Sequence, residues 1–167
     1  MVKPAFIAGV ALTLAGVIAG SWPAESTERS RRLVTKRTYD RRGPTVIVHD
    51  GAGRVRDATG QALSVTMLLG TDGYWVRSRQ GPVTREALRN TKVLVLDRAW
   101  EKLGDRRTTT LLSRWIHEGG AVLILAGGQG PEVRRQVGAG RIAVVDPAAF
   151  GTTDFVERLL AAMHWLD

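Results

Sequence analysis

The sequence predicts a three-layer α/β domain with a mostly parallel five-stranded sheet, preceded by one amino-terminal transmembrane helix. Two observations predict the domain. Short runs of β-branched and apolar residues recur along residues 45–167, and segments with helical spacing of apolar side chains lie between them. This alternation is typical of a parallel sheet covered on both faces, with right-handed crossovers. The third observation is an uncharged segment at residues 4–22, which predicts the membrane helix.

The amino-terminal segment has two interpretations. The 18 residues from Ala5 to Trp22 would make a helix about 27 Å long, enough to span a thin hydrocarbon core. Lys3 and Trp22 would then mark its two ends. The alternative is a cleaved signal peptide, with Lys3 as its charged region and small residues at 19–21 before the cut. We favour the anchor and assign residues 1–22 to it.

Positive charge is concentrated directly after this segment. The chain has a formal net charge of +8, and residues 21–42 hold seven basic side chains against three acidic ones. Because this stretch lacks apolar periodicity, we expect residues 23–44 to be an extended basic arm that becomes ordered against a partner. The side chains expected to contact a partner or lipid are Trp22, Arg29, Arg31, Arg32, Lys36, Arg37, Tyr39, Arg41 and Arg42.

The arm also indicates the kind of partner and the side of the membrane. Basic side chains seek anionic groups, so we expect contact with subunits of an integral membrane protein complex or with an anionic membrane surface. Nucleic acid is disfavoured, because Tyr39 alone offers a ring on which a base could stack. The Lys/Arg bias places the domain on the cytoplasmic side of a bacterial inner membrane. The periplasmic side is the alternative, since a short leader of this kind also exports domains.

The first half of the domain contains three predicted strands and two predicted helices. Residues 45–50 are a β-branched apolar run, which predicts a buried strand. A helix is expected over residues 58–69. Residues 74–80 alternate in polarity, which predicts a strand with one wetter face. A short helix over residues 84–90 and a buried strand over residues 92–97 follow.

The second half continues the alternation. Within residues 105–117, apolar side chains fall on one helical face, and a glycine pair supplies the left-handed stop. Residues 121–126 are the most apolar run, which predicts a central strand. A proline at its first turn predicts a short helix over residues 131–138. A strand over residues 141–146 and an amphipathic helix over residues 152–167 complete a flavodoxin-like domain.

Ligands of parallel α/β sheets bind beyond the carboxyl ends of the strands. The candidate ligand-binding residues there are Gly51, Gly53, Asp97, Gly127, Gly128, Gln129 and Asp146. Gly51-x-Gly53 begins like a dinucleotide loop, but Arg56 stands where the third glycine belongs, so a tight turn is favoured.

Two further chemistries are possible for the side chains at this edge. Asp97 and Asp146 would share a metal ion if their strands were neighbours, and would otherwise be capping or loop-bonding residues. His49 and Asp50 point to opposite faces of a strand and are not expected to form a pair. His117 and His164 lack the spacing of metal ligands. We therefore predict no metal site and no cofactor.

Residues 92–167 carry a family pattern. The stretches "KVLVLD", "LLSRWIHEGGAVLILAGG" and "VGAGRIAVVDPAAFGTTDFVERLLAAMHWL" resemble the class I glutamine-amidotransferase-like domains of membrane-associated bacterial proteins. The resemblance implies a flavodoxin-like fold, and in relatives the domain is frequently extracytoplasmic. Active members place a catalytic cysteine on the turn that follows the strand equivalent to residues 121–126. Here that turn reads Gly127-Gly128-Gln129-Gly130, and the chain has no cysteine.

These features predict a non-catalytic, membrane-anchored accessory subunit. It would dock on and stabilise a larger bacterial membrane protein complex, with photosynthetic and respiratory assemblies as plausible hosts. One alternative is a sensor that binds a small anion or nucleotide in the strand-end crevice. The other is a metal-dependent hydrolase that uses Asp50, Asp97 or Asp146.

Overall fold

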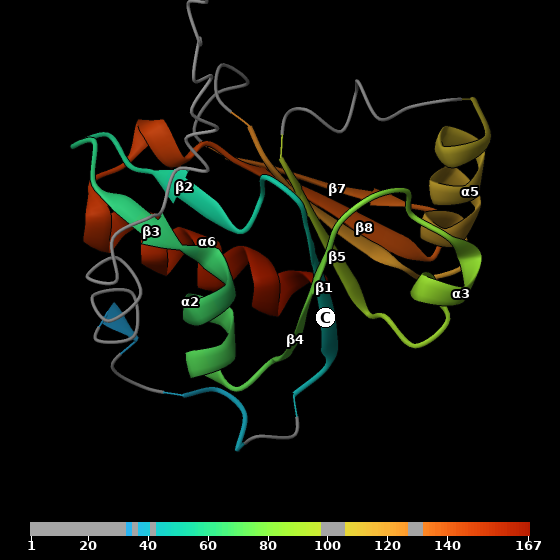
Figure 1. Ribbon diagram of the computed structural model, residues 1–167, viewed down its shortest axis with the longest axis horizontal. Helices are drawn as coiled ribbons and strands as arrows, with labels where there is room; N and C mark the ends of the chain where they lie inside the picture. The colour runs from blue at the N-terminus through green and yellow to red at the C-terminus, as the bar shows by residue number, and fades with distance from the viewer. Residues whose placement is uncertain (1–32, 35–36, 41–42, 98–105, 127–131) are drawn as a thin grey trace, which may run out of the picture.

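The computed structural model shows a mixed α/β domain built on one six-stranded sheet (Figure 1). The structure describes residues 33–34, 37–40, 43–97, 106–126 and 132–167. In sheet order, the strands are β4 (Trp75–Arg79), β1 (Thr45–His49), β5 (Val93–Asp97), β6 (Ala121–Leu125), β8 (Gly140–Val145) and β7 (Glu132–Val137). The first five are parallel, and β7 pairs antiparallel with β8. This order is consistent with a flavodoxin-like fold.

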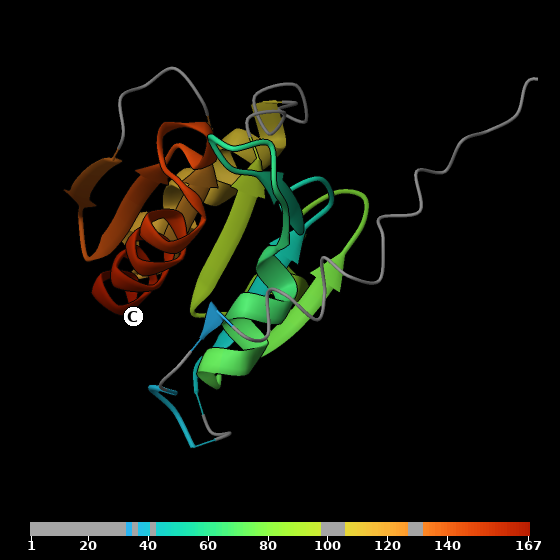
Figure 2. The ribbon, with the colours of Figure 1, turned by 90° about the vertical axis from the view of Figure 1, so that its left-hand side faces the viewer.

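Helices cover both faces of the sheet, as the alternation of elements predicts. The covering helices are α2 (Val65–Asp72) and α6 (Thr152–Leu166) on one face, and α3 (Arg85–Leu88) and α5 (Arg106–His117) on the other. Figure 2 shows α2 and α6 in front of the sheet and α5 behind it. Alternate residues of β1 enter the two cores: Val46 and Val48 face α2 and α6, while Ile47 faces α3 and α5.

The described residues confirm most of the predicted elements. All five predicted strands form, and the helices expected near residues 84–90, 105–117 and 152–167 are present. Thr84 caps α3 by accepting a hydrogen bond from the backbone N–H of Ala87 at 3.3 Å. Gly119, at φ +107°, provides the stop after α5.

The helix predicted over residues 131–138 is wrong, because residues 132–137 form the edge strand β7. Val133 and Val137 satisfy the four-residue spacing of a helix, but they also satisfy the two-residue spacing of a strand. Gly138, at φ +61°, closes a hairpin in which β7 pairs with β8 from Glu132 to Val137. The sheet therefore has six strands where the sequence predicts five. The exposed arginines of β7 are typical of a protected sheet edge.

The helix predicted over residues 58–69 is also wrong in its first half. Residues 54–56 and 62–64 are β2 (Arg54–Arg56) and β3 (Ala62–Ser64), a separate two-stranded sheet, and α2 begins only at Val65. Ser64 caps α2 by accepting from the Met67 N–H at 3.3 Å. The turn of this hairpin contains Gly60 at φ +78°, a conformation that a helix does not allow.

Asp57 holds this hairpin in place. Its buried carboxylate accepts from the Thr59 N–H at 2.8 Å, the Thr59 hydroxyl at 2.6 Å and the Gln61 N–H at 2.9 Å. The Thr152 hydroxyl, at the start of α6, donates to the second carboxylate oxygen. Burial alone would raise the pKa of Asp57, but these hydrogen bonds outweigh it and hold the pKa below its usual value. The hairpin is thereby joined to α6.

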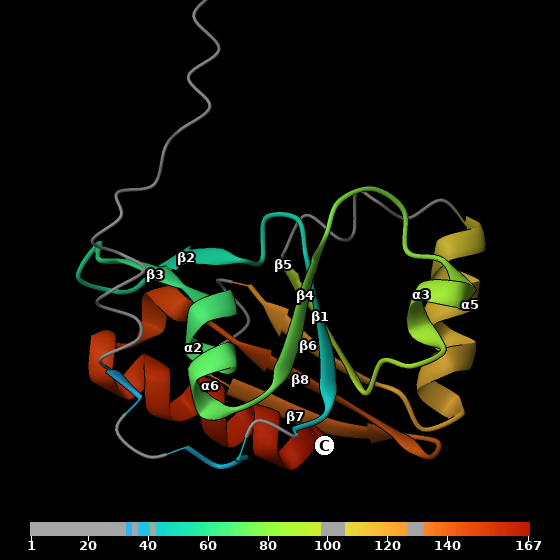
Figure 3. The same ribbon diagram turned by 60° about the horizontal axis from the view of Figure 1, so that its bottom comes forward.

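No helix within the described ranges is long and apolar enough to span a membrane, and the anchor predicted at residues 1–22 lies outside those ranges. Most of the arm predicted at residues 23–44 lies outside them as well. Its last described residues, 37–40 and 43–44, are seen against the domain (Figure 3).

Replacing Asp57 by asparagine tests the hairpin junction. We expect Asp57→Asn to lower the free energy of unfolding at neutral pH by about 2–3 kcal/mol, since hydrogen bonds to a charged group contribute about that much. The pKa is lower in the fold than the roughly 3.9 of an unfolded chain. The stabilisation is therefore complete above that value and lost as the pH falls through the folded pKa. Urea unfolding across acidic pH should show a smaller acid loss for Asp57→Asn than for the wild type. The exposed Asp154→Asn is the control. Equal acid sensitivity of Asp57→Asn and the wild type would contradict this role.

Candidate functional site

A crevice of about 680 Å³ opens at the carboxyl end of β1. It lies between the loop at residues 50–54, the start of α2 and the end of β4. The chain order places β4 on one side of β1 and β5 on the other, so this is the point where the strand order reverses. Open α/β sheets bind ligands at such switch points. The structure thus places predicted residues Gly51 and Gly53 in the wall of a real crevice.

Gly51 and Asp97 meet at this edge, as expected for the ends of adjacent strands. The backbone N–H of Ala52 donates to the carbonyl of His49 at 3.0 Å, and Gly51 has φ +86°, which together form the predicted tight turn. A Cβ at position 51 would collide with the Asp97 carboxylate. Gly53 differs, because its nearest neighbour would be 3.4 Å from such a Cβ. The turn is followed by strand β2. A dinucleotide-binding loop would instead be followed directly by a helix.

Asp146 is separated from Asp97. The strand β6 lies between β5 and β8, which puts their backbones roughly 10 Å apart. The register also aligns Asp97 with Leu125 and thus with Val145, one residue before Asp146. Asp146 accepts from the Ala148 N–H at 2.9 Å and caps the short 3₁₀ helix η1 (Pro147–Ala149), which is the capping role considered from sequence.

The remaining predicted residues of this edge divide into two groups. Gly127, Gly128 and Gln129 lie outside the described residues. His49 is buried, and its Nε2 lies 2.7 Å from the Gly81 carbonyl, to which it donates; its Nδ1 has no hydrogen-bond partner. Asp50 is exposed, so the two side chains do not form a pair. Among the described residues, no group of three or more His, Cys, Asp or Glu side chains is placed to hold a metal ion.

A second polar site joins the end of the arm to the domain, and no local sequence pattern predicts it. We call it the arm-docking cluster, and it consists of Thr38, Tyr39, Asp72, Tyr74, His164 and Asp167. The backbone N–H groups of Thr38 and Tyr39 donate to the Asp72 carbonyl at 3.1 and 3.0 Å. The hydroxyls of Tyr39 and Tyr74 both donate to Oδ2 of Asp167, the latter at 2.8 Å.

Rings and charges reinforce the arm-docking cluster. The Tyr39 and Tyr74 rings meet edge to face with centroids 5.0 Å apart, a favourable aromatic geometry. Burial raises the pKa of Tyr39 to about 12, with a further contribution from the hydrogen bond to Asp167. Burial likewise raises the pKa of Tyr74, so both hydroxyls remain donors at neutral pH. The residues that contact one another here are up to 128 positions apart in the sequence.

The arm-docking cluster contains the residue types of a hydroxyl–His–Asp triad without its geometry. The Nε2 atom of His164 lies 2.9 Å from the Thr38 hydroxyl and 2.8 Å from Oδ2 of Asp72. A triad needs the acid on one ring nitrogen and the nucleophile on the other, so that a proton can pass between them. Here both partners contact the same nitrogen. The arrangement fastens chain segments together and does not activate the Thr38 hydroxyl.

The residues predicted to contact a partner or lipid are in part described by the structure. Arg37 is exposed, while Tyr39 is directed into the arm-docking cluster of its own domain. The expectation that the arm stays extended until a partner arrives is therefore not met at Thr38 and Tyr39, because Asp72 and Asp167 already satisfy their polar groups. The others, Trp22, Arg29, Arg31, Arg32, Lys36, Arg41 and Arg42, lie outside the described residues.

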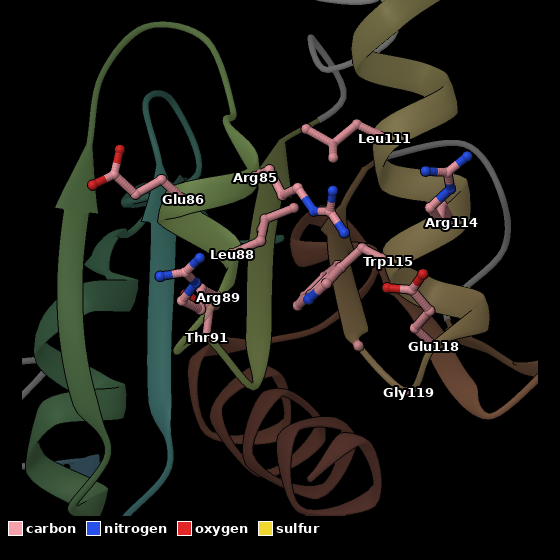
Figure 4. Close-up of a pocket in the computed structure, with 11 residues that line it drawn as sticks. Arg85, Glu86, Leu88, Arg89, Thr91, Leu111, Arg114, Trp115, Glu118 and Gly119 are labelled. Carbon is pink, nitrogen blue, oxygen red and sulfur yellow. The ribbon is translucent and has the colours of Figure 1, made fainter.

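A cleft of about 830 Å³ between α3 and α5 was also missed from sequence (Figure 4). Arg85 points from α3 toward α5, and Trp115 points from α5 toward α3. Arg89 and Arg114 also line the cleft. In the sequence these arginines are scattered over two helices, in a region with only a small net charge. The fold brings these arginines together in space, and no local sequence pattern predicts that they lie close to one another.

Comparison with protein-family models, with curated proteins and with solved structures gave no significant match. The class that the fold and site define is thus a mixed α/β domain with a mostly parallel sheet.

Three glycine substitutions test the strand-end turn. Gly60→Ala should lower the free energy of unfolding by about 1–2 kcal/mol, the cost of a left-handed backbone for a residue with a side chain, since nothing lies within 4 Å of its Cβ. Gly51→Ala should lose more, because it adds the collision with Asp97. Gly53→Ala should be nearly neutral. Chemical denaturation measures all three, and adding Asp97→Ala to Gly51→Ala should recover part of the loss. Equal losses at positions 51 and 60 would contradict the crowding by Asp97.

Proposed function

We propose that this chain is a non-catalytic, membrane-anchored accessory subunit that docks on and stabilises a larger bacterial membrane protein complex. The observation that carries the proposal is the arm-docking cluster. A flexible linker between a membrane anchor and a domain needs no fixed contacts with that domain. Here, by contrast, Thr38 and Tyr39 are held by backbone hydrogen bonds to Asp72 and by the Asp167 carboxylate.

This fastening limits how far the domain stands from the membrane. Leu33 and Val34 already pack against the core, so the linker between the proposed anchor and the domain comprises residues 23–32, which number 10. Fully extended, they reach at most about 35 Å. The basic side chains of this linker suit an anionic membrane surface or an acidic subunit surface. We propose the cytoplasmic face of the inner membrane for the domain, with the periplasmic face as the alternative.

The strand-end crevice favours this function over a sensor of anions or nucleotides. The Asp97 carboxylate lies against Gly51, where the backbone of the turn would otherwise cradle an anion. A carboxylate at that place repels phosphate and competes for the same backbone groups. The hydrolase alternative uses Asp50, Asp97 or Asp146 with a metal ion; β6 separates the strands of Asp97 and Asp146, and the described residues contain no group of three or more potential metal ligands. We therefore propose neither activity.

The resemblance to class I glutamine-amidotransferase-like domains fits the same proposal. The chain has no cysteine, and the turn after β6 reads Gly-Gly-Gln-Gly where active members carry the nucleophile. A glutamine side chain has no nucleophilic atom to activate. We propose that the domain is a degenerate relative that keeps the flavodoxin-like fold for binding.

Extraction from native membranes in mild detergent tests the proposed function. We expect the tagged full chain to co-purify with a fixed set of membrane proteins at constant stoichiometry, because a structural subunit is bound continuously. A variant lacking residues 1–22 is the matched control and should lose them. Recovery of the full chain as a lone monomer would overturn the proposal. Phosphatase and fluorescent-protein fusions after Asp167 would report the side of the membrane.

Replacing Tyr39 by phenylalanine tests the fastening of the arm. The variant keeps the ring and loses the hydrogen bond to Asp167, so the amides at positions 38 and 39 should exchange with deuterium about tenfold faster, which corresponds to roughly 1.4 kcal/mol. Amides of β6 should be unchanged and serve as the internal control. The raised pKa adds a pH signature: the tyrosine stabilises the docked arm fully below about pH 10 and loses that effect as the pH rises through about 12. Tyr39→Phe should lack this alkaline step, and an unchanged exchange rate would show that the hydroxyl does not hold the arm.

A further inference from the structure

Five exposed arginines surround the cleft between α3 and α5. A second hollow of about 570 Å³ adjoins the cleft along α5, and the two share Arg85 and Arg114. The five side chains are Arg85, Arg89, Arg106, Arg107 and Arg114. Within the part of the chain that the structure describes, none of the five forms an ion pair or a hydrogen bond through its side chain. Among the described residues of the lining, Glu86 and Glu118 alone carry negative charge, and Glu86 points away from the space between the helices (Figure 4).

Several arginines elsewhere in the domain have partners. Arg134 and Arg158 contact Glu132 at 2.5 and 3.4 Å, and Arg141 donates to the Trp165 carbonyl at 2.6 Å. The cleft therefore differs from these paired arginines, because it gathers in one place five exposed guanidinium groups without partners among the described residues. Guanidinium groups bind carboxylates in bidentate fashion when such a partner arrives.

The start of α5 strengthens this contrast. Arg106 and Arg107 occupy the first turn of the helix, which has no acidic side chain. The helix dipole makes that end partially positive, so the dipole itself disfavours two cations there. A bound anionic group would relieve both the dipole and the repulsion between neighbouring guanidinium groups.

The floor of the cleft is apolar. Leu88 is buried beneath it, and the half-buried Leu111 and Trp115 line it from α5. The Trp115 ring lies directly over Gly120, where any Cβ would collide with it, so the glycine leaves the space that the ring occupies. Tryptophan and arginine together are the residue types that dominate the energetics of protein interfaces.

From these observations we propose that the α3–α5 cleft is the docking site for an acidic segment of a partner protein that also carries apolar side chains. This inference rests on the proposed function and names the chemistry of the partner. The carboxylates of the segment would pair with Arg85, Arg114 and the start of α5, while an apolar side chain would cover Trp115. A membrane surface is flat and cannot enter the concave cleft, and a phosphate alone would leave the apolar floor exposed to water.

The test measures binding of a fluorescein-labelled peptide, in which glutamates alternate with leucines, to the purified full chain in detergent. The cleft variant is Arg85→Gln with Arg114→Gln. The matched control, Arg77→Gln with Arg135→Gln, removes the same charge from exposed positions on the edge strands β4 and β7. We expect the cleft variant to bind at least about tenfold more weakly, the control to stay within about twofold, and added salt to weaken wild-type binding. Leu111→Ser should also weaken it, and unchanged melting curves will show that the variants are folded.

The outcomes separate the docking site from its alternatives. Equal loss in the cleft variant and the control would mean general charge attraction and would overturn the proposal. Selective binding of inorganic polyphosphate or of phosphatidylglycerol vesicles through Arg85 and Arg114, without binding of the peptide, would overturn it as well. If the cleft variant still co-purifies with membrane proteins as the wild type does, the docking site is wrong and the proposed function stands. If the wild type is recovered alone yet binds the peptide through the cleft, the proposed function fails and the docking site stands.

Discussion

The structure depends on one constraint: the central strands must be buried on both faces. In β5 and β6 nearly every residue is buried, with Val93 and Val95 on one side and Leu94 and Leu96 on the other. A strand of this kind is stable only when helices cover both faces, because its apolar side chains would otherwise meet water. The chain satisfies the constraint by crossing between parallel strands with α2, α3 and α5 and by ending with α6. The position of every site follows from these crossings.

Because both faces of the sheet are covered, polar side chains at the ends of the covering helices become buried and need hydrogen-bond partners within the domain. Asp72, at the end of α2, is fully buried, and its carboxylate contacts His164 from α6 and Thr38 from the arm. A buried carboxylate without partners would be costly, so the three segments depend on one another at this point. Asp57 performs a similar task at the opposite end of α6, where it joins the hairpin of β2 and β3 to Thr152. Two buried carboxylates thus hold the two ends of α6 to segments distant in sequence.

Elements that depend on neighbouring residues can be predicted from the sequence, whereas elements that depend on residues far along the chain cannot. The strands β1, β5, β6 and β8 are predicted because their apolar runs are a local signal of burial. The strand β7 is not, since Val133 and Val137 satisfy two periods at once and only pairing with β8 decides between them. The hairpin near Asp57 depends on Thr152, which lies 95 residues away. The residues next to Asp57 in the sequence therefore do not reveal this hydrogen-bond partner.

The sites show the same division. The meeting of Gly51 with Asp97 is predictable, because both follow parallel strands that end at one edge of the sheet. The separation of Asp97 from Asp146 is not, because it depends on the position of β6 between their strands. The arm-docking cluster and the arginines of the α3–α5 cleft each combine elements that the sequence keeps apart. The neighbours of Tyr39 in the sequence do not reveal that its hydroxyl donates to Asp167, which lies 128 residues away.

The two polar features lie on different layers of the domain, and this arrangement bears on how the protein works. The arm-docking cluster lies at the ends of α2 and α6, and the cleft lies between α3 and α5. Figures 1 and 3 show that these two pairs of helices cover opposite faces of the sheet. A partner can therefore occupy the cleft without displacing the arm. Because the sheet between them is a packed core, the arm and the cleft are held in a fixed relation to each other. A domain built in this way would transmit the position of the proposed anchor to the proposed partner, which is the physical requirement for a subunit that holds an assembly together.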